Sequence, residues 1–553
     1  MNHWTPKSVL ALRSYSLEQL QHDLIAGVTV GLVALPLAMA FAISSGVSPQ
    51  AGIYCAIVTG FLISALGGSR FQIGGPTGAF VVVVSGIIAK YGIDGLFMST
   101  MMAGVLLVVL GATGLGSAVK FIPQPVVIGF TNGIAVTIAS TQLRDMFGLQ
   151  MTSVPADFLP KMQALLAAAG TWSHAATALG VGTLVLLIVW RRLAIRVPGY
   201  IVVLVLTTAA SAVIGFPVET IGSRFGGIAG TLPHIVVPNF RADLILTLLS
   251  PALTIAMLGS VESLLSAVVA DRLGGDRHNP NVELIAQGVA NIVSPLVGGL
   301  PATGALARTA TNIRSGARTP VSGMIHALTL LAVLLVAAPL ARFVPLATLA
   351  GILLMVAYQM GEWAEIPQLL KLPKADIAVW VVTFGLTVFA DLTVAVETGM
   401  ILAMLMFIRK VSRTTSVVAV AEEEAEEGRL HVLQDKDLPD YVSVFRVSGP
   451  LLFGATDSLL EIVDRERLAP IVILKLRYVT AMDATGLRAL EDLADQIKRM
   501  GSALIVCSAQ PQPASLMAAG EFREHVGSAN ICANTAAALV RARELHAQQR
   551  TAA

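Results

Sequence analysis

Two short segments carry residue types that suit the binding of a small anion. They are Gly74–Ala79 (GGPTGA) and Gly298–Ala305 (GGLPATGA), and each places a glycine pair and a proline ahead of Thr-Gly-Ala or Ala-Thr-Gly-Ala and a short apolar helix. Proline suits a first helical turn because the N–H that it lacks would have no hydrogen-bond partner within the helix at that position. Helix N-termini present unpaired N–H groups and partial positive charge, which together bind anions. The expected backbone donors are Thr77, Gly78 and Ala79 on one side and Gly304, Ala305 and Leu306 on the other.

Charged side chains are rare in the neighbouring apolar stretches. Glu262 is the only acid between Leu244 and Ala270. An ionisable residue in mid-span is a functional candidate by default, because its charge is costly in hydrocarbon. Such a carboxylate is able to bind a proton and to carry it with a substrate anion. The alternative is a permanent counter-charge to Arg308, one turn into the second short helix, that fixes geometry without titrating.

Composition restricts the class of protein that contains these segments. The chain has 553 residues, of which 55% are hydrophobic and 13% charged, and its mean hydropathy is +0.75. Soluble domains carry about a quarter charged residues, so most of this chain is expected to lie in a membrane. The net charge of +2 argues against nucleic acid as a partner. Three scattered cysteines and nine histidines without ligand spacing predict neither a disulfide framework nor a metal or cofactor site.

Apolar helices must therefore position the two segments. A bilayer-spanning helix needs about 20 residues, and the predicted spans are Leu24–Ile43, Ala51–Leu66, Gly95–Leu115, Pro125–Ser140, Ala176–Trp190, Gly199–Ile214, Ile245–Ala270, Leu284–Val297, Val321–Leu340, Pro345–Gln359, Asp376–Ala390 and Leu392–Phe407. Pro76–Ala89 and Ala302–Ile313 are too short or too polar to cross alone. Interrupted segments at matching places in two halves indicate a transporter's substrate site. The alternative is a pair of kinked helices with accidental similarity.

Basic residues in the loops predict the orientation. With fourteen segments counted, the even-numbered loops hold Lys120; Arg191, Arg192 and Arg196; Arg272 and Arg277; Arg314 and Arg318; Lys371 and Lys374. The odd-numbered loops hold fewer, so the positive-inside rule puts both termini in the cytoplasm of a protein of the inner (plasma) membrane. Residues 1–23 are interpreted as an uncleaved cytoplasmic lead-in, since Glu18 and Asp23 immediately precede the first apolar run.

The composition changes after residue 412. The acidic tract Glu422–Glu427 indicates a solvated linker over residues 413–440. Beyond it, strands are expected at Val442–Val447, Ile471–Leu476 and Ala503–Cys507, with a helix at Leu487–Lys498. Alternating strands and helices predict a small α/β domain with a partly parallel sheet over residues 441–546, followed by a tail at 547–553.

Several blocks, taken in order, resemble the SulP anion transporters, the bacterial counterparts of SLC26 proteins. They are Ala26–Gly46, Gly67–Phe80, Gly259–Leu273 and Glu283–Gly323. The C-terminal part resembles a STAS domain. The resemblance implies an α-helical polytopic membrane protein with fourteen transmembrane segments in two inverted seven-segment repeats (core and gate domains) over residues 24–412, usually a homodimer. It also implies that the two short helices are the third and tenth segments and face each other at the bilayer midplane.

The same resemblance assigns roles to side chains. It places Arg308 near the anion, although a structural ion pair or an interfacial position is the alternative. Sodium-coupled bicarbonate members carry Asp at the position of Glu262 and hydroxyl residues at those of Ser266 and Leu306. Here Ser266 keeps its hydroxyl, but Leu306 offers no oxygen to a hard cation. Proton coupling through Glu262 and Ser266 is therefore favoured over sodium coupling.

The function implied is secondary active transport of an anion. By analogy we favour proton-coupled uptake of C4-dicarboxylates such as succinate or fumarate, with sulfate or bicarbonate as the alternative. A passive anion channel on the same fold and a membrane enzyme or sensor are further alternatives. No enzyme is predicted, because Gly74–Ala79 is not followed by the Lys-Ser/Thr of a phosphate loop and no nucleophile–base pair stands out.

The turn Asp483-Ala484-Thr485-Gly486 is the candidate regulatory site of the STAS domain. Relatives of this fold are phosphorylated on the Ser or Thr of such a turn, and a phosphate at a helix N-terminus is electrostatically favourable. The alternative, which we favour, is that Asp483 and Thr485 cap the helix. We expect the domain to serve regulation, dimer contacts or the docking of a regulatory protein rather than transport itself.

Overall fold

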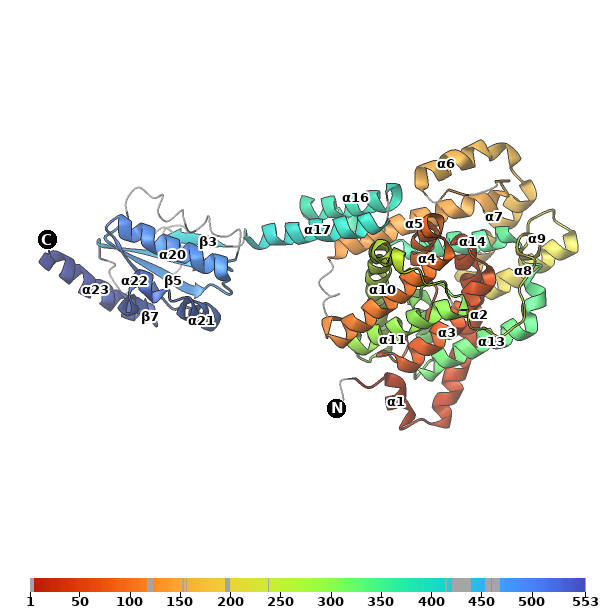
Figure 1. Ribbon diagram of the computed structural model, residues 1–553, viewed down its shortest axis with the longest axis horizontal. Coiled ribbons are helices and arrows are strands. Elements are labelled where there is room, and N and C mark those ends of the chain that lie inside the picture. The colour runs from red at the N-terminus through yellow and green to blue at the C-terminus, as the bar shows by residue number, and fades with distance from the viewer. Residues whose placement is uncertain are drawn as a thin grey trace. The chain divides into compact units, whose positions relative to one another are not determined.

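The computed structural model describes residues 4–116, 123–151, 154–155, 157–193, 199–236, 238–390, 392–412, 415–419, 439–452, 459 and 468–552. The chain divides into two compact units, Met1–Ile401 and Leu402–Ala553. The first unit is helical, and the second combines helices with a five-stranded sheet (Figure 1).

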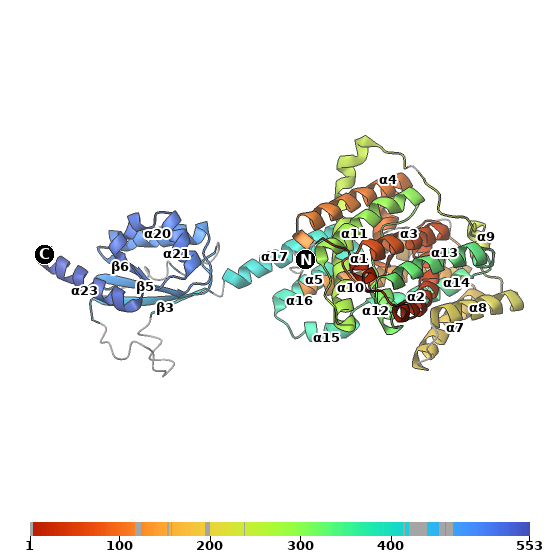
Figure 2. The same cartoon turned by 90° about the horizontal axis from the view of Figure 1, so that it is seen from below.

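One group of helices in the first unit packs around the two broken segments, and we call it the core bundle. It consists of α2 (Leu17–Ser44), α3 (Pro49–Leu66), α4 (Ala79–Ala112), α10 (Ile245–Gly274), α11 (Pro280–Val293), α12 (Leu306–Arg314) and α13 (Val321–Ala341), with α1 (Lys7–Leu12) against α3. Helices α4 and α11 lie side by side (Figure 2). A Cβ at Gly104 would approach the carbonyl oxygen of Gly288 to 2.7 Å, so glycine is what permits this close contact.

A second group, which we call the gate bundle, packs around α5. It consists of α5 (Gln124–Phe147), α7 (His174–Arg192), α8 (Gly199–Ile214), α14 (Leu346–Met360) and α16 (Lys374–Phe389), and α17 (Leu392–Ser412) follows it in the chain. The connections carry α6 (Phe158–Ala167), α9 (Ile221–Phe225), α15 (Ile366–Leu369) and the single turns η2 (Ala169–Thr171), η3 (Ala242–Leu244), η4 (Ser294–Val297) and η5 (Trp363–Glu365).

The predicted spans correspond to helices, with differences at their ends. Eight helices among the described residues are long and apolar enough to cross a membrane, and α8 is a shorter apolar helix. The predicted segments Pro76–Ala89 and Gly95–Leu115 join in α4, where Gly92 (φ 71°) breaks the helical backbone between them. Helix α6 was not predicted. The count of fourteen spans and the inverted repeats remain predictions.

The second unit is built on a sheet with strand order β3-β4-β5-β6-β7. The strands are β3 (Ser416–Ala419), β4 (Val442–Ser448), β5 (Ile471–Tyr478), β6 (Ala503–Cys507) and β7 (Ile531–Cys532), and only the β3–β4 pair is antiparallel. The helices are α20 (Ala484–Arg499), α21 (Pro511–Ala519), α22 (Arg523–Val526) and α23 (Thr535–Ala552), with the turn η6 (Ser528–Asn530). Val472 and Leu474 pack with Leu490 of α20, whereas Ile473 packs with Leu539 of α23 on the other face. The partly parallel α/β prediction is confirmed.

Two boundaries differ from those predicted for the C-terminal region. Strand β3 lies inside the range 413–440 that was interpreted as a linker, because its four residues pair with β4 and extend the sheet. Helix α23 continues through most of the predicted tail, to Ala552. The acidic tract Glu422–Glu427 and the loop residues Lys120 and Arg196 lie outside the described residues.

Candidate functional site

The two broken segments meet as a pair of very short strands. Strand β1 (Gly74–Gly75) pairs antiparallel with β2 (Thr303–Gly304), with Gly74 opposite Gly304 and Gly75 opposite Thr303. The amide of Ala305 continues the pairing by donating to the carbonyl of Ile73 at 2.8 Å. This pairing joins the residues that directly precede α4 and α12 in the core bundle. The meeting of the two helix starts at the bilayer midplane, which the resemblance implies, stays a prediction.

The first turns of both helices leave backbone amides without protein partners. At α4, the backbone hydrogen bonds of the helix begin with the amide of Phe80, which donates to the carbonyl of Thr77 at 3.3 Å. At α12 they begin with the amide of Thr309, which donates to the carbonyl of Ala305 at 2.8 Å. Within the described ranges, the amides with no acceptor are those of Thr77, Gly78 and Ala79 at α4 and of Leu306, Ala307 and Arg308 at α12.

The donor set at α12 therefore differs from the predicted Gly304, Ala305 and Leu306. Gly304 is part of strand β2, and the amide of Ala305 is occupied by Ile73. The pairing occupies the amide of Ala305, whereas Gly74 and Gly304 face each other as a pair whose amides do not bond across the strands. Of the three predicted donors at α12, Leu306 is the one that lies in the first turn of the helix, and its amide has no acceptor among the described residues.

The Arg308 side chain lies behind the paired strands. It is 2% exposed, and its Nη2 donates to the carbonyl oxygen of Pro76, the residue that precedes the first turn of α4. Its Nη1 has no partner in the described part of the chain. A Cβ at Gly75 would lie 2.5 Å from that Nη1, so glycine leaves the room that the guanidinium occupies. In this arrangement Arg308 ties the start of α4 to α12.

Glu262 projects from α10 to the start of α4. Its Oε2 accepts a hydrogen bond from the hydroxyl of Thr77 at 2.9 Å. Among the described ion pairs none joins Glu262 to Arg308, so the counter-charge alternative finds no direct contact. The carboxylate borders a cavity of about 80 Å³ between the core and gate bundles, whose lining includes Ala79, Val126, Phe130, Leu265 and Met360.

Several polar side chains hold the broken segments; the sequence singled out Ser266 among them, whereas Thr309, Gln72, Ser263 and Asn291 were not predicted. Ser266 donates to the hydroxyl of Thr309 at 3.2 Å, and that hydroxyl accepts from the amide of Ile73 at 3.1 Å. Gln72 donates to the hydroxyl of Ser263 at 2.9 Å, and Asn291 makes two bonds of 2.8 Å to the backbone of Ala302. Buried amides and hydroxyls within apolar runs are the signal that would have found them, because each needs a partner.

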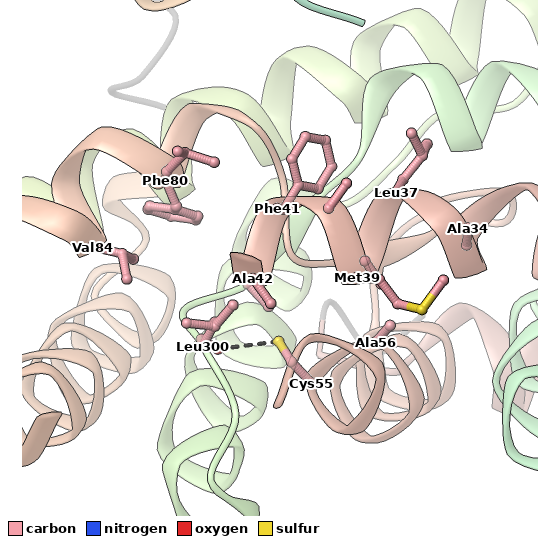
Figure 3. Close-up of a cluster of buried hydrophobic side chains, with 14 of the residues drawn as sticks. Ala34, Leu37, Met39, Phe41, Ala42, Cys55, Ala56, Phe80, Val84 and Leu300 are labelled. Carbon is pink, nitrogen blue, oxygen red and sulfur yellow. Dashed lines mark hydrogen bonds between the residues drawn. The ribbon is translucent and has the colours of Figure 1, made fainter. Parts of the chain in front are cut away.

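Apolar packing supports the first turn of α4 and the chain ahead of β2 (Figure 3). Phe41 and Met39 of α2 and Phe80 of α4 belong to one buried cluster. Cys55 of α3 donates from its Sγ to the carbonyl of Leu300 at 3.1 Å. The chain ahead of β2 is thus fixed to α3 as well as to β1.

A wide vestibule opens from one side of the bundles toward this region. Its volume is about 1600 Å³, and it is lined by residues of both bundles, among them Thr29, Ala307, Thr311, Tyr200 and Tyr358. At the opposite ends of α2 and α5, the Gln142 side chain donates to the hydroxyl of Ser44 at 2.9 Å and joins the two bundles. The vestibule therefore lies on the side of the predicted cytoplasmic loops of the helical unit.

The predicted regulatory turn lies at the start of α20. Asp483 is its N-cap and accepts from the amide of Gly486 at 2.8 Å, as the capping alternative requires. Thr485 is exposed. Gln512 of α21 bonds to both the amide and the carbonyl of Met482 at 2.9 and 2.8 Å, which fixes the backbone ahead of the turn.

Comparison with known proteins agrees with this architecture. The model of the sulfate permease family matches residues 20–383, and that of the STAS domain matches residues 435–538. The chain belongs to the sulfate permease (SulP/SLC26) family. It is accordingly a polytopic membrane protein of a transporter family with a C-terminal STAS domain.

Relatives extend over most of this SulP chain. YvdB of Bacillus subtilis, named as a candidate sulfate transporter, is 43% identical over 91% of this chain and 94% of its own. The bicarbonate transporter BicA of Picosynechococcus is 32% identical over 86% of each chain. The solved transmembrane domain of a cyanobacterial BicA matches 70% of this chain and 98% of its own, at a TM-score of 0.61 and 34% identity. Murine Slc26a9 in its inward-facing state shares the fold over 98% of this chain and 94% of its own, at a TM-score of 0.87 and 18% identity.

Proposed function

We propose that this protein is a secondary active transporter that carries a small oxyanion, sulfate or bicarbonate, together with a proton. The observation that supports the proposal is the pairing of β1 with β2, the strands that directly precede the starts of α4 and α12, because the first amides of both helices have no acceptor among the described residues. Main-chain N–H groups at two helix starts bind an anion without a large basic cluster. Arg308 adds a fixed positive charge behind the strands.

The names of similar proteins support a compact oxyanion as the substrate. The cavity beside Ala79 and Glu262 has a volume of about 80 Å³ and adjoins the vestibule, so it accommodates a small anion without excluding a longer one. Sulfate and bicarbonate are the anions in the names of the similar proteins YvdB and BicA. The C4-dicarboxylate favoured by sequence analogy is longer, and it remains a substrate to be tested beside them.

Proton coupling is supported by the surroundings of Glu262. Among the described residues, the Glu262 carboxylate accepts a hydrogen bond from the Thr77 hydroxyl alone and borders an apolar cavity. A charge is costly there, so binding of a proton together with the anion is favourable. Sodium is the alternative coupling ion, because the hydroxyls of Ser266 and Thr309 lie in the same region. Leu306 still supplies no side-chain oxygen.

The remaining expectations belong to the same proposal. Both termini lie in the cytoplasm, the vestibule opens to that side, and the protein acts as a homodimer with the STAS domain as a regulatory or docking module. Thr485 is the candidate phosphorylation site, with capping of α20 by Asp483 as its alternative.

Uptake by purified protein in proteoliposomes tests the proposal. Labelled sulfate, bicarbonate and succinate are supplied separately, with pH and sodium gradients imposed one at a time. Accumulation of one oxyanion above its outside concentration, driven by the pH gradient alone, is the expected result. Flux that never exceeds equilibration would identify a channel, and a response to sodium alone would reassign the coupling ion.

A further inference from the structure

Three arginines line the vestibule from three different helices. They are Arg191, Arg272 and Arg314, in the last turns of α7, α10 and α12. All three are exposed, and none takes part in an ion pair among the described residues. We propose that these arginines form an anion-collecting site that concentrates substrate in the vestibule ahead of the binding cavity. The proposal rests on the proposed function and extends it to a second, outer site.

The vestibule leads to the inner cavity. Val127 of α5 and Leu265 of α10 line both spaces, so the two adjoin. Ala307 and Thr311 of α12 also line the vestibule, one helical turn apart on the helix whose first amides are free. An anion held by the arginines therefore lies beside α12, the helix whose first amides belong to the proposed binding site.

The charges of the vestibule lining are unevenly distributed. Glu362 and Glu365 are the acids in the lining, so its side chains carry a net charge of +1. Both acids lie just after α14, whereas the arginines come from α7, α10 and α12. On the wall that the arginines form, charge of one sign raises the local concentration of anions, and the two acids on the other wall reduce this effect.

A simpler role for the arginines is to neutralise helix C-termini and to fix orientation in the membrane. Three other arginines nearby in the sequence provide a control that distinguishes the two roles. Arg192, Arg277 and Arg318 lie within five residues of the first three, are exposed, and are not part of the vestibule lining. Changing either set to glutamine removes three charges from the same loops, so only the position relative to the vestibule differs.

Tryptophan fluorescence measures the anion concentration directly. Trp190 and Trp363 line the vestibule, and the other three tryptophans can be replaced in a W4F/W172F/W380F background of the full chain. Iodide quenches by reaching the ring as an anion, and acrylamide does so as a neutral molecule. We expect R191Q/R272Q/R314Q to lower the iodide-to-acrylamide ratio of quenching constants by about twofold or more. The control R192Q/R277Q/R318Q should leave it unchanged.

Equal ratios in the two triple variants would overturn the proposal. The acrylamide constant also reports whether each variant keeps the vestibule fold, since a misfolded protein exposes both rings to the neutral quencher. Because quenching needs no transport, a protein that collects iodide but carries no oxyanion would leave this inference standing and refute the proposed function. Conversely, suppose that R191Q/R272Q/R314Q transports the oxyanion at the unaltered rate and with the same dependence on salt concentration as the original protein. That result would contradict this inference and leave the proposed function standing.

Discussion

Glu262 is the side chain on which coupling depends in this mechanism. Its carboxylate meets the hydroxyl of Thr77 at the first turn of α4, so protonation and anion binding occur at the same helix start. We expect Glu262→Gln, which mimics the protonated form, to abolish accumulation driven by a pH gradient while anion exchange at equal concentrations continues. Uptake and counterflow in the same vesicles measure the two properties.

Survival of pH-driven accumulation in that variant would show that another group carries the proton. Thr77→Val is the matched variant, because it removes the hydrogen bond and keeps the acid. We expect it to retain coupling and to weaken anion affinity only modestly, since Glu262 is protonated when the anion is bound in this mechanism, and its hydrogen bond with Thr77 is then a neutral one that contributes about 1 kcal/mol.

Lys161 makes a prediction about stability and pH. It lies on α6, outside the predicted spans, is 2% exposed, and its Nζ donates to the Ser140 hydroxyl at 3.5 Å. Burial lowers its pKa to about 8, which the nearby Asp157 only partly opposes. The unfolded chain holds this proton more tightly, so stability of the native protein rises with pH between about 8 and 10.4.

Lys161→Met should therefore raise the midpoint of thermal unfolding by about 3 °C or more at pH 7, and the gain should shrink above pH 8. Differential scanning fluorimetry across this pH range checks it. Lys371→Met, at an exposed position, is the control and should show no such pH-dependent gain. A gain that stays constant with pH would contradict the assigned cause.

At the scale of elements, the geometry of β1 makes the site sensitive to a single methyl group. Gly75 has φ 149°, and a Cβ there would lie 2.5 Å from Arg308 Nη1. Gly75→Ala should reduce transport by about tenfold or more, since strain of 1–3 kcal/mol displaces α4 from Arg308. Gly86→Ala in α4 is the control, because nothing lies within 4 Å of its added Cβ. Initial uptake rates compared at equal protein content would show whether the two differ.

The elements were largely predictable from the sequence, because 20-residue apolar runs and Gly-Pro interruptions have direct physical causes. The strand pairing was not, since two residues per strand leave no alternating pattern. The hydrogen bond of the Arg308 side chain was not predicted for a related reason. Its acceptor is a backbone carbonyl 232 residues away, and since every residue has a backbone carbonyl, the sequence does not single out this one. The role of Gln72 depends likewise on contacts between distant helices.

On the scale of the whole molecule, the helical unit and the STAS unit each have a core of their own. We expect a chain that ends after Ser412 to insert, to stay monodisperse and to take up the substrate. The solved transmembrane domain of a cyanobacterial BicA is a comparable part of a relative. Size-exclusion chromatography and vesicle uptake test this.

The matched truncation ends after Phe389 and lacks α17. A Cβ at Gly399 of α17 would lie 2.6 Å from the Thr383 hydroxyl, so α17 packs closely on α16 and its loss should destabilise the gate bundle. An inactive but well-folded chain ending at Ser412 would mean that the STAS domain takes part in transport itself.

Recognition of the substrate by main-chain amides, as proposed here, has a consequence for anion selectivity. The amides at the starts of α4 and α12 are present whatever side chains surround them, so they favour negative charge without selecting one anion over another. Selection among anions then falls to the opposite wall, where Val126 and Phe130 of α5 and Met360 of α14 face Glu262 across the small cavity. We therefore expect that exchanging these few apolar side chains of α5 and α14 between relatives changes which anion is transported.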